Sequence, residues 1–291
     1  MNTVCVAGAT GYLGRFLVAE FLRRGWQVLA LVRDRQRAQA GGLVADALIE
    51  AQATERTSLS GVLGGVDLVV SALGITRQRD GLSYCDVDYR ANLNLLEEAL
   101  DAGVGKFAYV HVLGAASLPD VALVAAKQAF VDKLRTAPIA SCVISPSGYF
   151  SDMQDFLGMA RSGRVWLFGD GSHRINPIHG ADLAAAIADA IETGRTSLEI
   201  GGPDILSHRE IAELAFAALD KPARITCLPD WPRRAALWLL PRVTPLAWHG
   251  PVQFFLAAMG QDVVGEPHGT HRLEDFFRQA AGDRSEQDAP Q

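Results

Sequence analysis

The first fourteen residues narrow the possible folds more than any other part of the chain. A short run rich in β-branched residues, 3–7, leads into Gly8-Ala9-Thr10-Gly11-Tyr12-Leu13-Gly14, and apolar residues then recur at helical spacing over 12–24. Glycines in such a strand–turn–helix let the chain turn tightly, let its backbone approach a pyrophosphate and let the helix pack against the strand. The spacing is not that of a P-loop. We therefore predict a dinucleotide-binding βαβ unit whose phosphate loop comprises Gly8, Thr10, Gly11, Tyr12, Leu13 and Gly14.

Short apolar runs alternate with helical patterns through the first 150 residues. This alternation is typical of a parallel sheet with helices on both faces, and right-handed crossovers make such a sheet doubly wound. We predict an α/β fold with an NAD(P)-binding Rossmann domain over residues 1–150. The expected strands are 27–32, 67–73, 107–112 and 140–145, with a weaker one within 43–51, and the expected helices are 89–102 and 121–134.

The alternation breaks after Pro146. Strands are predicted over 165–168 and 198–200, and helices over 180–192 and 208–219. We interpret residues 151–281 as a smaller C-terminal substrate lobe interleaved with the end of the sheet. The last ten residues are polar and predict a disordered tail over 282–291.

Charge and cysteine content exclude several classes of partner. A net charge of −6 argues against a nucleic-acid binder, which needs a basic face. The four cysteines have no CxxC spacing, so we expect reduced thiols and neither disulfides nor a metal site.

The N-terminus enters the glycine motif without a basic leader, which predicts a cytoplasmic protein. Residues 235–260 contain no 18-residue apolar run, so no transmembrane helix is expected, while Arg233 and Arg234 leave a peripheral membrane contact open.

The end of the second predicted strand indicates which nicotinamide cofactor is bound. A basic residue there accommodates the 2′-phosphate of NADP, whereas an acidic one binds the ribose hydroxyls of NAD. Arg33 occupies this place and Arg15 follows the last loop glycine, so NADP(H) is favoured over NAD, although Asp34 adjoins Arg33. The alternative is that Arg15 and Arg33 are both solvated surface charges.

Several segments together carry a family resemblance. GATGYLGRFL, VLALVRD, VDLVVSALG, NLNLLEEALDAGV and RSGRVWLFGDGSHRINPIHGADLA are similar to atypical short-chain dehydrogenases/reductases, and most closely to their NmrA-like and isoflavone-reductase-like branch. The resemblance covers nearly the whole chain. It implies an oxidoreductase with an NADP(H) site at Gly8, Gly11, Gly14 and Arg33 and in the loop Ala72, Leu73 and Gly74. The resemblance also implies that Gln52, after the third strand, contacts adenine through its amide; the alternative is that Gln52 lies on the surface.

The chain departs from the family at the catalytic pair. Typical members use Tyr-x-x-x-Lys, in which the lysine lowers the pKa of the tyrosine, but here Leu123 precedes Lys127. The remaining candidate catalytic residues are Lys127, which can hold the nicotinamide ribose and relay a proton, and His111, at a strand end. The resemblance also places Pro146 at the cofactor and Tyr149 beside the nicotinamide. His111 as a structural histidine and Tyr149 as a pocket wall are the alternatives.

Two functions fit these observations. The first is an NADPH-dependent reductase that transfers hydride to a conjugated double bond, quinone or carbonyl of a hydrophobic small molecule, because the C-terminal lobe is rich in aromatic residues. The second is a non-catalytic NADP(H)-binding redox sensor or assembly factor, which the missing tyrosine favours.

Overall fold

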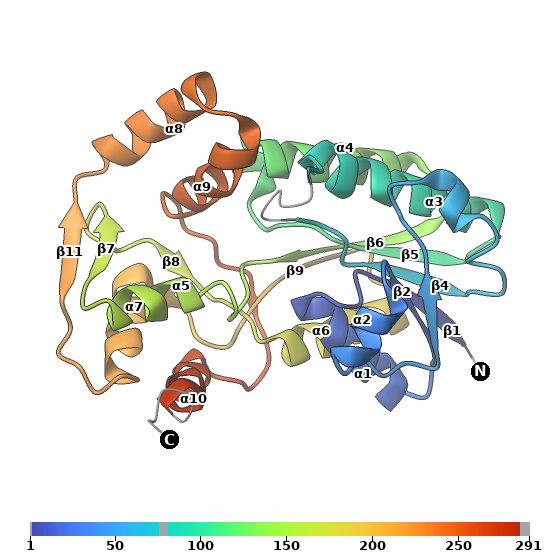
Figure 1. Cartoon of the computed structure of the whole chain (residues 1–291), viewed down its shortest axis with the longest axis horizontal. Helices are drawn as coiled ribbons and strands as arrows, with labels where there is room; N and C mark the ends of the chain where they lie inside the picture. Colours follow the sequence, from blue (N-terminus) through green and yellow to red (C-terminus); the bar gives the residue numbers. More distant parts are fainter. Residues whose placement is uncertain (1, 76–80, 286–291) are drawn as a thin grey trace. The chain divides into compact units, whose positions relative to one another are not determined.

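The computed structural model describes residues 2–75 and 81–285 and divides into two compact units (Figure 1). The first unit comprises Met1–Ser145 and Leu183–Leu198, and the second comprises Pro146–Asp182 and Glu199–Gln291. The helix over 180–192 therefore returns the chain to the first unit after the predicted boundary near residue 150.

A parallel sheet forms the centre of the first unit. Within the first unit, its strands lie in the order β6-β5-β4-β1-β2-β3. The order reverses at β1, which pairs with β2 on one side and β4 on the other, so the predicted doubly wound topology is confirmed. The strand bounds are β1 Thr3–Ala7, β2 Gln27–Val32, β3 Ala47–Glu50, β4 Leu68–Ser71, β5 Lys106–Val110 and β6 Ala140–Pro146.

Helices cover both faces of this sheet. Helices α3 and α4 lie on one face, where Leu95 and Phe130 pack with Phe107 of β5, and α1, α2 and α6 lie on the other (Figure 1). Arg24 joins α1 to α6 through Asp189, 2.7 Å away. The helix bounds are α1 Tyr12–Arg23, α2 Arg35–Ala40, α3 Asn92–Asp101, α4 Ala122–Thr136 and α6 Gly180–Glu192, with short 3-10 turns at Arg56–Leu59 and Ala115–Ser117.

The helix predicted over 89–102 begins earlier and differently. A π-helix, Cys85–Ala91, leads directly into α3. The wider π turn shifts side chains off the spacing of an α-helix, so the apolar pattern indicates only the α3 portion. Asp88 lies in the π-helix and is fully buried.

The second unit is built from short strand pairs and helices around a separate core of Phe150, Phe156, Leu167, Phe216 and other apolar residues. Strand β7 pairs with β11 in parallel, β8 pairs with β10 antiparallel, and β9 pairs with β12 in parallel. The strand bounds are β7 Val165–Phe168, β8 Arg174–Ile175, β9 Ser197–Gly201, β10 Leu206–Ser207, β11 Ile225–Leu228 and β12 Glu266–Pro267. The helices are α5 Gln154–Arg161, α7 His208–Ala217, α8 Trp231–Val243, α9 Leu246–Ala258 and α10 Leu273–Ser285.

The predicted disordered tail needs a correction. Helix α10 extends to Ser285, so residues 282–285 are helical, and residues 286–291 lie outside the described residues. Leu273 and Phe277 are buried at the start of α10, and a helix anchored in this way continues through polar residues at little cost. Within 2–75 and 81–285, no helix combines the length and apolar character needed to cross a bilayer.

Candidate functional site

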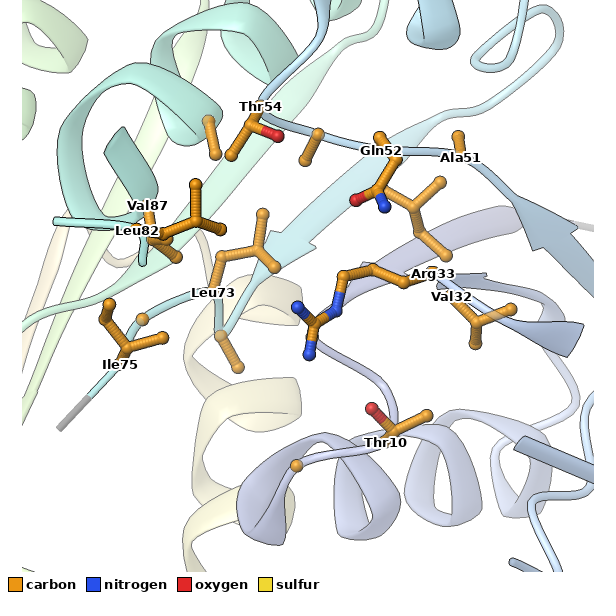
Figure 2. A pocket seen from close by; sticks show the side chains of 17 residues that line it. Thr10, Val32, Arg33, Ala51, Gln52, Thr54, Leu73, Ile75, Leu82 and Val87 are labelled. Atoms are coloured by element: carbon orange, nitrogen blue, oxygen red, sulfur yellow. The ribbon is translucent and has the colours of Figure 1, made fainter. Parts of the chain in front are cut away.

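A cavity of about 280 Å³ lies at the carboxyl ends of β1 to β4, where an open α/β sheet binds ligands (Figure 2). Every lining residue belongs to the first unit. The lining residues are Gly8, Thr10, Gly11, Leu31, Val32, Arg33, Ala51, Gln52, Ala53, Thr54, Ala72, Leu73, Gly74, Ile75, Leu82, Val87 and Ala91.

The glycines of the phosphate loop are required by close approaches. Gly8 has φ +81°, and a Cβ there would lie 2.8 Å from the Ala72 carbonyl oxygen. A Cβ on Gly14 would lie 2.1 Å from the Gly8 carbonyl oxygen, so α1 packs against the loop more closely than any side chain allows. Gly8 and Gly11 line the cavity, whereas Gly14 acts through this packing.

The amino end of α1 offers a site for an anion. Gly11 is the N-cap and has no side chain to accept from the first-turn N–H groups. The first turn contains no acidic residue, so the positive end of the helix is not neutralised locally. Such an end next to a glycine loop binds phosphate. Of the other predicted loop residues, Thr10 lines the cavity, Leu13 is buried and Tyr12 packs edge-on against Phe16.

The structure separates the three charged residues that bear on cofactor choice. Arg33 lines the cavity and its guanidinium points into it (Figure 2). The Asp34 carboxylate accepts a hydrogen bond from the Arg37 N–H at 2.8 Å and thereby caps α2. Arg15 donates to the carbonyl oxygens of Thr10, at 3.2 Å, and Gly41, at 2.8 Å, and is not a lining residue. Asp34 is thus used as a helix cap, and Arg33 alone of the three lines the cavity.

The wall opposite the phosphate loop is mostly apolar. The Gln52 side chain lines the cavity, and its backbone N–H donates to the Ser58 hydroxyl at 2.8 Å, which holds the segment after β3 in place. Sequence reasoning missed nine lining residues, because side chains without a motif become neighbours only through the sheet topology. These are Leu31, Val32, Ala51, Ala53, Thr54, Ile75, Leu82, Val87 and Ala91.

Lys127 is enclosed by polar groups of the first unit. Its Nζ lies 3.2 Å from Oδ1 of Asp88, donates to the Val110 carbonyl oxygen at 3.2 Å, and lies 3.5 Å from the Tyr109 hydroxyl. Only 11% of the Lys127 side chain is exposed. Burial raises the pKa of Asp88, an effect that the Lys127 charge opposes, and burial raises the pKa of Tyr109 to about 12. Asp88 and Tyr109 are functional candidates that no sequence motif indicated.

This buried pair supports one wall of the cavity. The Ile75 N–H donates to Oδ2 of Asp88 at 3.3 Å. A Cβ on Gly74 would lie 2.7 Å from Oδ1 of Asp88 and 2.9 Å from Nζ of Lys127. Lys127 does not line the cavity itself, but it lies directly behind Gly74, which does line the cavity. The Asp88–Lys127 pair therefore fixes the position of the loop at Gly74 and Ile75.

His111 directly follows β5 and does not line the cavity. It is 6% exposed, and Nε2 lies 3.1 Å from Oε1 of Gln128. Burial, followed by the neighbouring Lys127 charge, lowers the pKa of His111 to about 4. The lowered pKa favours the neutral ring at pH 7 and so supports the structural alternative for His111 over a role as an acid.

Pro146 and Tyr149 belong to the second unit. Pro146 ends β6, and the Tyr149 N–H donates to the Asp152 carboxylate at 3.2 Å. Both remain predicted cofactor-site residues, because their assignment rests on the family resemblance.

Comparison with known proteins gives relatives of two kinds. A maize chloroplastic divinyl chlorophyllide a 8-vinyl-reductase is 31% identical over 82% of this chain and 65% of its own length, so this chain spans just under two thirds of that relative. The photosystem II assembly factor Ycf39 of Synechocystis is 26% identical over 78% of this chain and 70% of the relative.

The fold is shared with solved reductases. The crystal structure of an NADPH-dependent quinone oxidoreductase from Escherichia coli, complexed with NADPH, matches with a TM-score of 0.71 at 18% identity, covering 97% of this chain and 99% of that one. At this identity the likeness shows the fold.

The comparisons contradict the predicted cytoplasmic location. The maize relative is chloroplastic, and an Arabidopsis relative, 25% identical over 77% of this chain and 60% of its own length, is a mitochondrial NADH dehydrogenase subunit. The prediction rested only on the few residues before the glycine motif, and these do not decide the compartment in which a protein of this fold works.

The family model covers most of the chain. The NmrA-like family model matches residues 1–233, which include the whole glycine loop, the cavity and the Asp88–Lys127 pair. The α/β fold with a parallel sheet expected from the sequence is the one observed. The chain therefore belongs to the NmrA-like family.

Proposed function

We propose that this protein is an NADPH-dependent reductase that transfers hydride to a hydrophobic small molecule bearing a conjugated double bond, a quinone or a carbonyl. The observation that carries the proposal is Arg33, whose guanidinium points into a cavity bounded by the glycine loop and the amino end of α1. The relatives support it, since one is a vinyl-reductase and a structural neighbour is an NADPH-dependent quinone oxidoreductase.

Each end of the cavity suits a part of the cofactor. The loop backbone and the α1 N-terminus suit the pyrophosphate. Arg33 suits a 2′-phosphate through charge-assisted hydrogen bonds, and Gln52 with its apolar neighbours suits adenine. NADPH supplies the hydride when bound.

Lys127 has two roles in this proposal, positioning the loop beside the cofactor and relaying a proton. Its ammonium and the Asp88 carboxylate hold the loop at Gly74, and the nicotinamide ribose is expected to approach this loop. Leu123 stands where the family has its tyrosine and is 4% exposed, so no phenol donates the proton from that position. The proton that follows the hydride is relayed from Lys127 or from water.

A second function is favoured by the same enclosure of Lys127. A chain whose lysine is held by Asp88, Val110 and Tyr109, and which lacks the tyrosine, can bind NADP(H) without turnover. The Synechocystis relative is an assembly factor. The alternative is therefore a non-catalytic NADP(H)-binding sensor or assembly factor.

The two functions differ in NADPH turnover. We expect saturable NADPH binding and NADPH oxidation with at least one member of a panel of lipophilic quinones and enones. Tight binding without oxidation across the panel supports the non-catalytic alternative. Failure to bind NADPH contradicts both.

Lys127 is tested in a background that avoids an unpaired buried charge. Lys127→Met alone leaves the Asp88 carboxylate without its counter-ion, which costs about 3–5 kcal/mol of stability. We therefore compare Asp88→Asn/Lys127→Met with Asp88→Asn, and use Lys133→Met, an exposed lysine of the same helix, as the control. With a substrate in hand, kcat should fall about 100- to 10,000-fold relative to Asp88→Asn, while the Kd for NADPH rises less than about tenfold. An unchanged kcat removes Lys127 from the mechanism.

A further inference from the structure

The segment 231–261 differs in charge from the rest of the chain. It contains three arginines and three tryptophans but no aspartate, glutamate or lysine, in a chain whose net charge is −6. In the structure this segment forms the consecutive helices α8 and α9, which contact one another within the second unit (Figure 1). We call these two helices the aromatic hairpin.

Helix α8 presents a continuous apolar face to solvent. Trp231, Trp238, Leu239 and Val243 are 70%, 62%, 46% and 61% exposed. They recur at i, i+7, i+8 and i+12, which places them on one side of an α-helix. None of the thirteen residues of α8, all of which the structure describes, is buried. A helix of this length is marginal in water unless one face is covered, so the exposed side of α8 lacks the packing that normally stabilises such a helix.

Helix α9 continues the exposed surface while its other side joins the core. Leu256 and Met259 are buried, and Met259 belongs to the core of the second unit. Trp248 and Val252, one turn apart, are 79% and 45% exposed, and Phe255 is 37% exposed. The aromatic hairpin is thus anchored by α9 and exposes apolar side chains from both helices.

Two arginines lie on the exposed side of α8. Arg234 and Arg242 are exposed, and the Arg242 guanidinium lies 4.4 Å from the centre of the Trp238 ring. Arg233 is used within the fold, because it pairs with Asp230 at 2.6 Å and donates to the Leu256 carbonyl oxygen at 3.0 Å. The exposed face therefore combines tryptophan, leucine and valine with positive charge and no acidic side chain.

We propose that the aromatic hairpin docks on the surface of an anionic lipid bilayer. Tryptophans favour the headgroup region, where an apolar ring body and a polar N–H are both accommodated. Arginines beside them are attracted by anionic headgroups. The face suits such a surface better than it suits a second copy of this chain. The net charge of a second copy is negative, but a symmetric contact would bring its positively charged hairpin against this one. The inference does not rest on the proposed reductase function.

The test is co-sedimentation of the full chain with vesicles. Phosphatidylglycerol/phosphatidylcholine vesicles should bind the protein, and pure phosphatidylcholine vesicles should bind it at least about tenfold more weakly. Each arginine near an anionic surface contributes roughly a factor of five in affinity. Arg234→Glu/Arg242→Glu should therefore weaken binding at least 25-fold, by about fivefold per arginine removed. The matched control is Arg164→Glu/Arg224→Glu, which reverses two exposed arginines of the same unit outside the hairpin and should leave binding unchanged.

The aromatic contribution is tested separately. Trp248→Ser should weaken vesicle binding roughly tenfold, whereas Trp166→Ser, at a tryptophan that is 49% exposed on β7, should not. Circular dichroism shows whether each variant is folded. Equal loss in the hairpin variants and their controls, or no binding to anionic vesicles by the folded parent, overturns the proposal. A parent that is dimeric in sedimentation, that does not bind vesicles and that becomes monomeric on Trp248→Ser shows that a second copy covers the face, which also overturns it.

Discussion

Helices α1 and α8 have nearly the same length, 12 and 13 residues, and opposite environments. Helix α1 buries Leu13, Gly14, Leu17, Val18 and Phe21 in the first unit. Helix α8 buries none of its residues and exposes two tryptophans. Helical spacing of apolar residues is present in both, so the pattern predicts a helix without revealing what covers its apolar face. In α1 that cover is the sheet, and in α8 we infer that it is supplied from outside the chain.

The two helices also differ at their amino ends. Helix α1 begins at Tyr12 after its N-cap, Gly11, which lines the cavity. Helix α8 begins at Trp231 after Asp230 and carries Pro232 in its first turn. The first arrangement leaves backbone N–H groups for a ligand. The second pairs its acidic residue internally with Arg233. The first unit is therefore organised around an internal site and the hairpin around an external surface.

The largest effect that separates the helices is on stability. Leu17 is fully buried in α1, so Leu17→Ala should lower the free energy of unfolding by about 2–5 kcal/mol. Leu239 is 46% exposed in α8, so Leu239→Ala should change it by less than about 0.5 kcal/mol. Urea unfolding of both variants measures the difference. Equal losses would show that α8 is packed as firmly as α1 in solution.

The next effect separates an arginine of the cavity from one of the hairpin. Arg33→Ala should weaken NADPH binding about 10- to 100-fold, because a hydrogen bond to a charged group is worth roughly 1.5–3 kcal/mol, and should leave NADH binding nearly unchanged. Arg234→Ala is the same change on α8 and should alter neither. Fluorescence titration gives the dissociation constants. Equal weakening of NADPH and NADH by Arg33→Ala would contradict the assignment of Arg33 to the 2′-phosphate.

The last effect is one in which the two units should agree. His111 of the first unit and His208 of the second are each 6% exposed, and burial lowers the pKa of each to about 4. The unfolded chain binds these protons more tightly, so stability is complete above about pH 6.5 and is lost as the pH falls toward 4. Each histidine should cost about 2 kcal/mol at pH 5 relative to pH 7.5.

This pH dependence is measured by urea unfolding at pH 7.5 and 5. His111→Gln and His208→Gln should each reduce the difference between the two pH values by a similar amount. A parent-like pH dependence in either variant would show that the corresponding ring is not held neutral by burial.

Much of the first unit could be predicted from the sequence, because its signals are local. Short β-branched runs, helical spacing and glycines at fixed positions indicated the strands, the helices and the phosphate loop. Arg33 could be placed because it directly follows β2. These features depend on backbone geometry within a few residues. Such conformational requirements select the types of the neighbouring residues, and they do not depend on distant parts of the chain.

The tertiary structure decided which polar groups meet. Sequence alone could not show that Asp34 caps α2, that Arg15 is held by Gly41, or that Lys127 is enclosed by Asp88 and Tyr109. It also could not show that His111 is buried and neutral. These outcomes depend on segments far apart in the chain and on the loss of solvent around them, which sets both the partner and the pKa of each group. The local pattern therefore determined where the glycine loop lies, whereas tertiary packing determined which distant side chains contact one another.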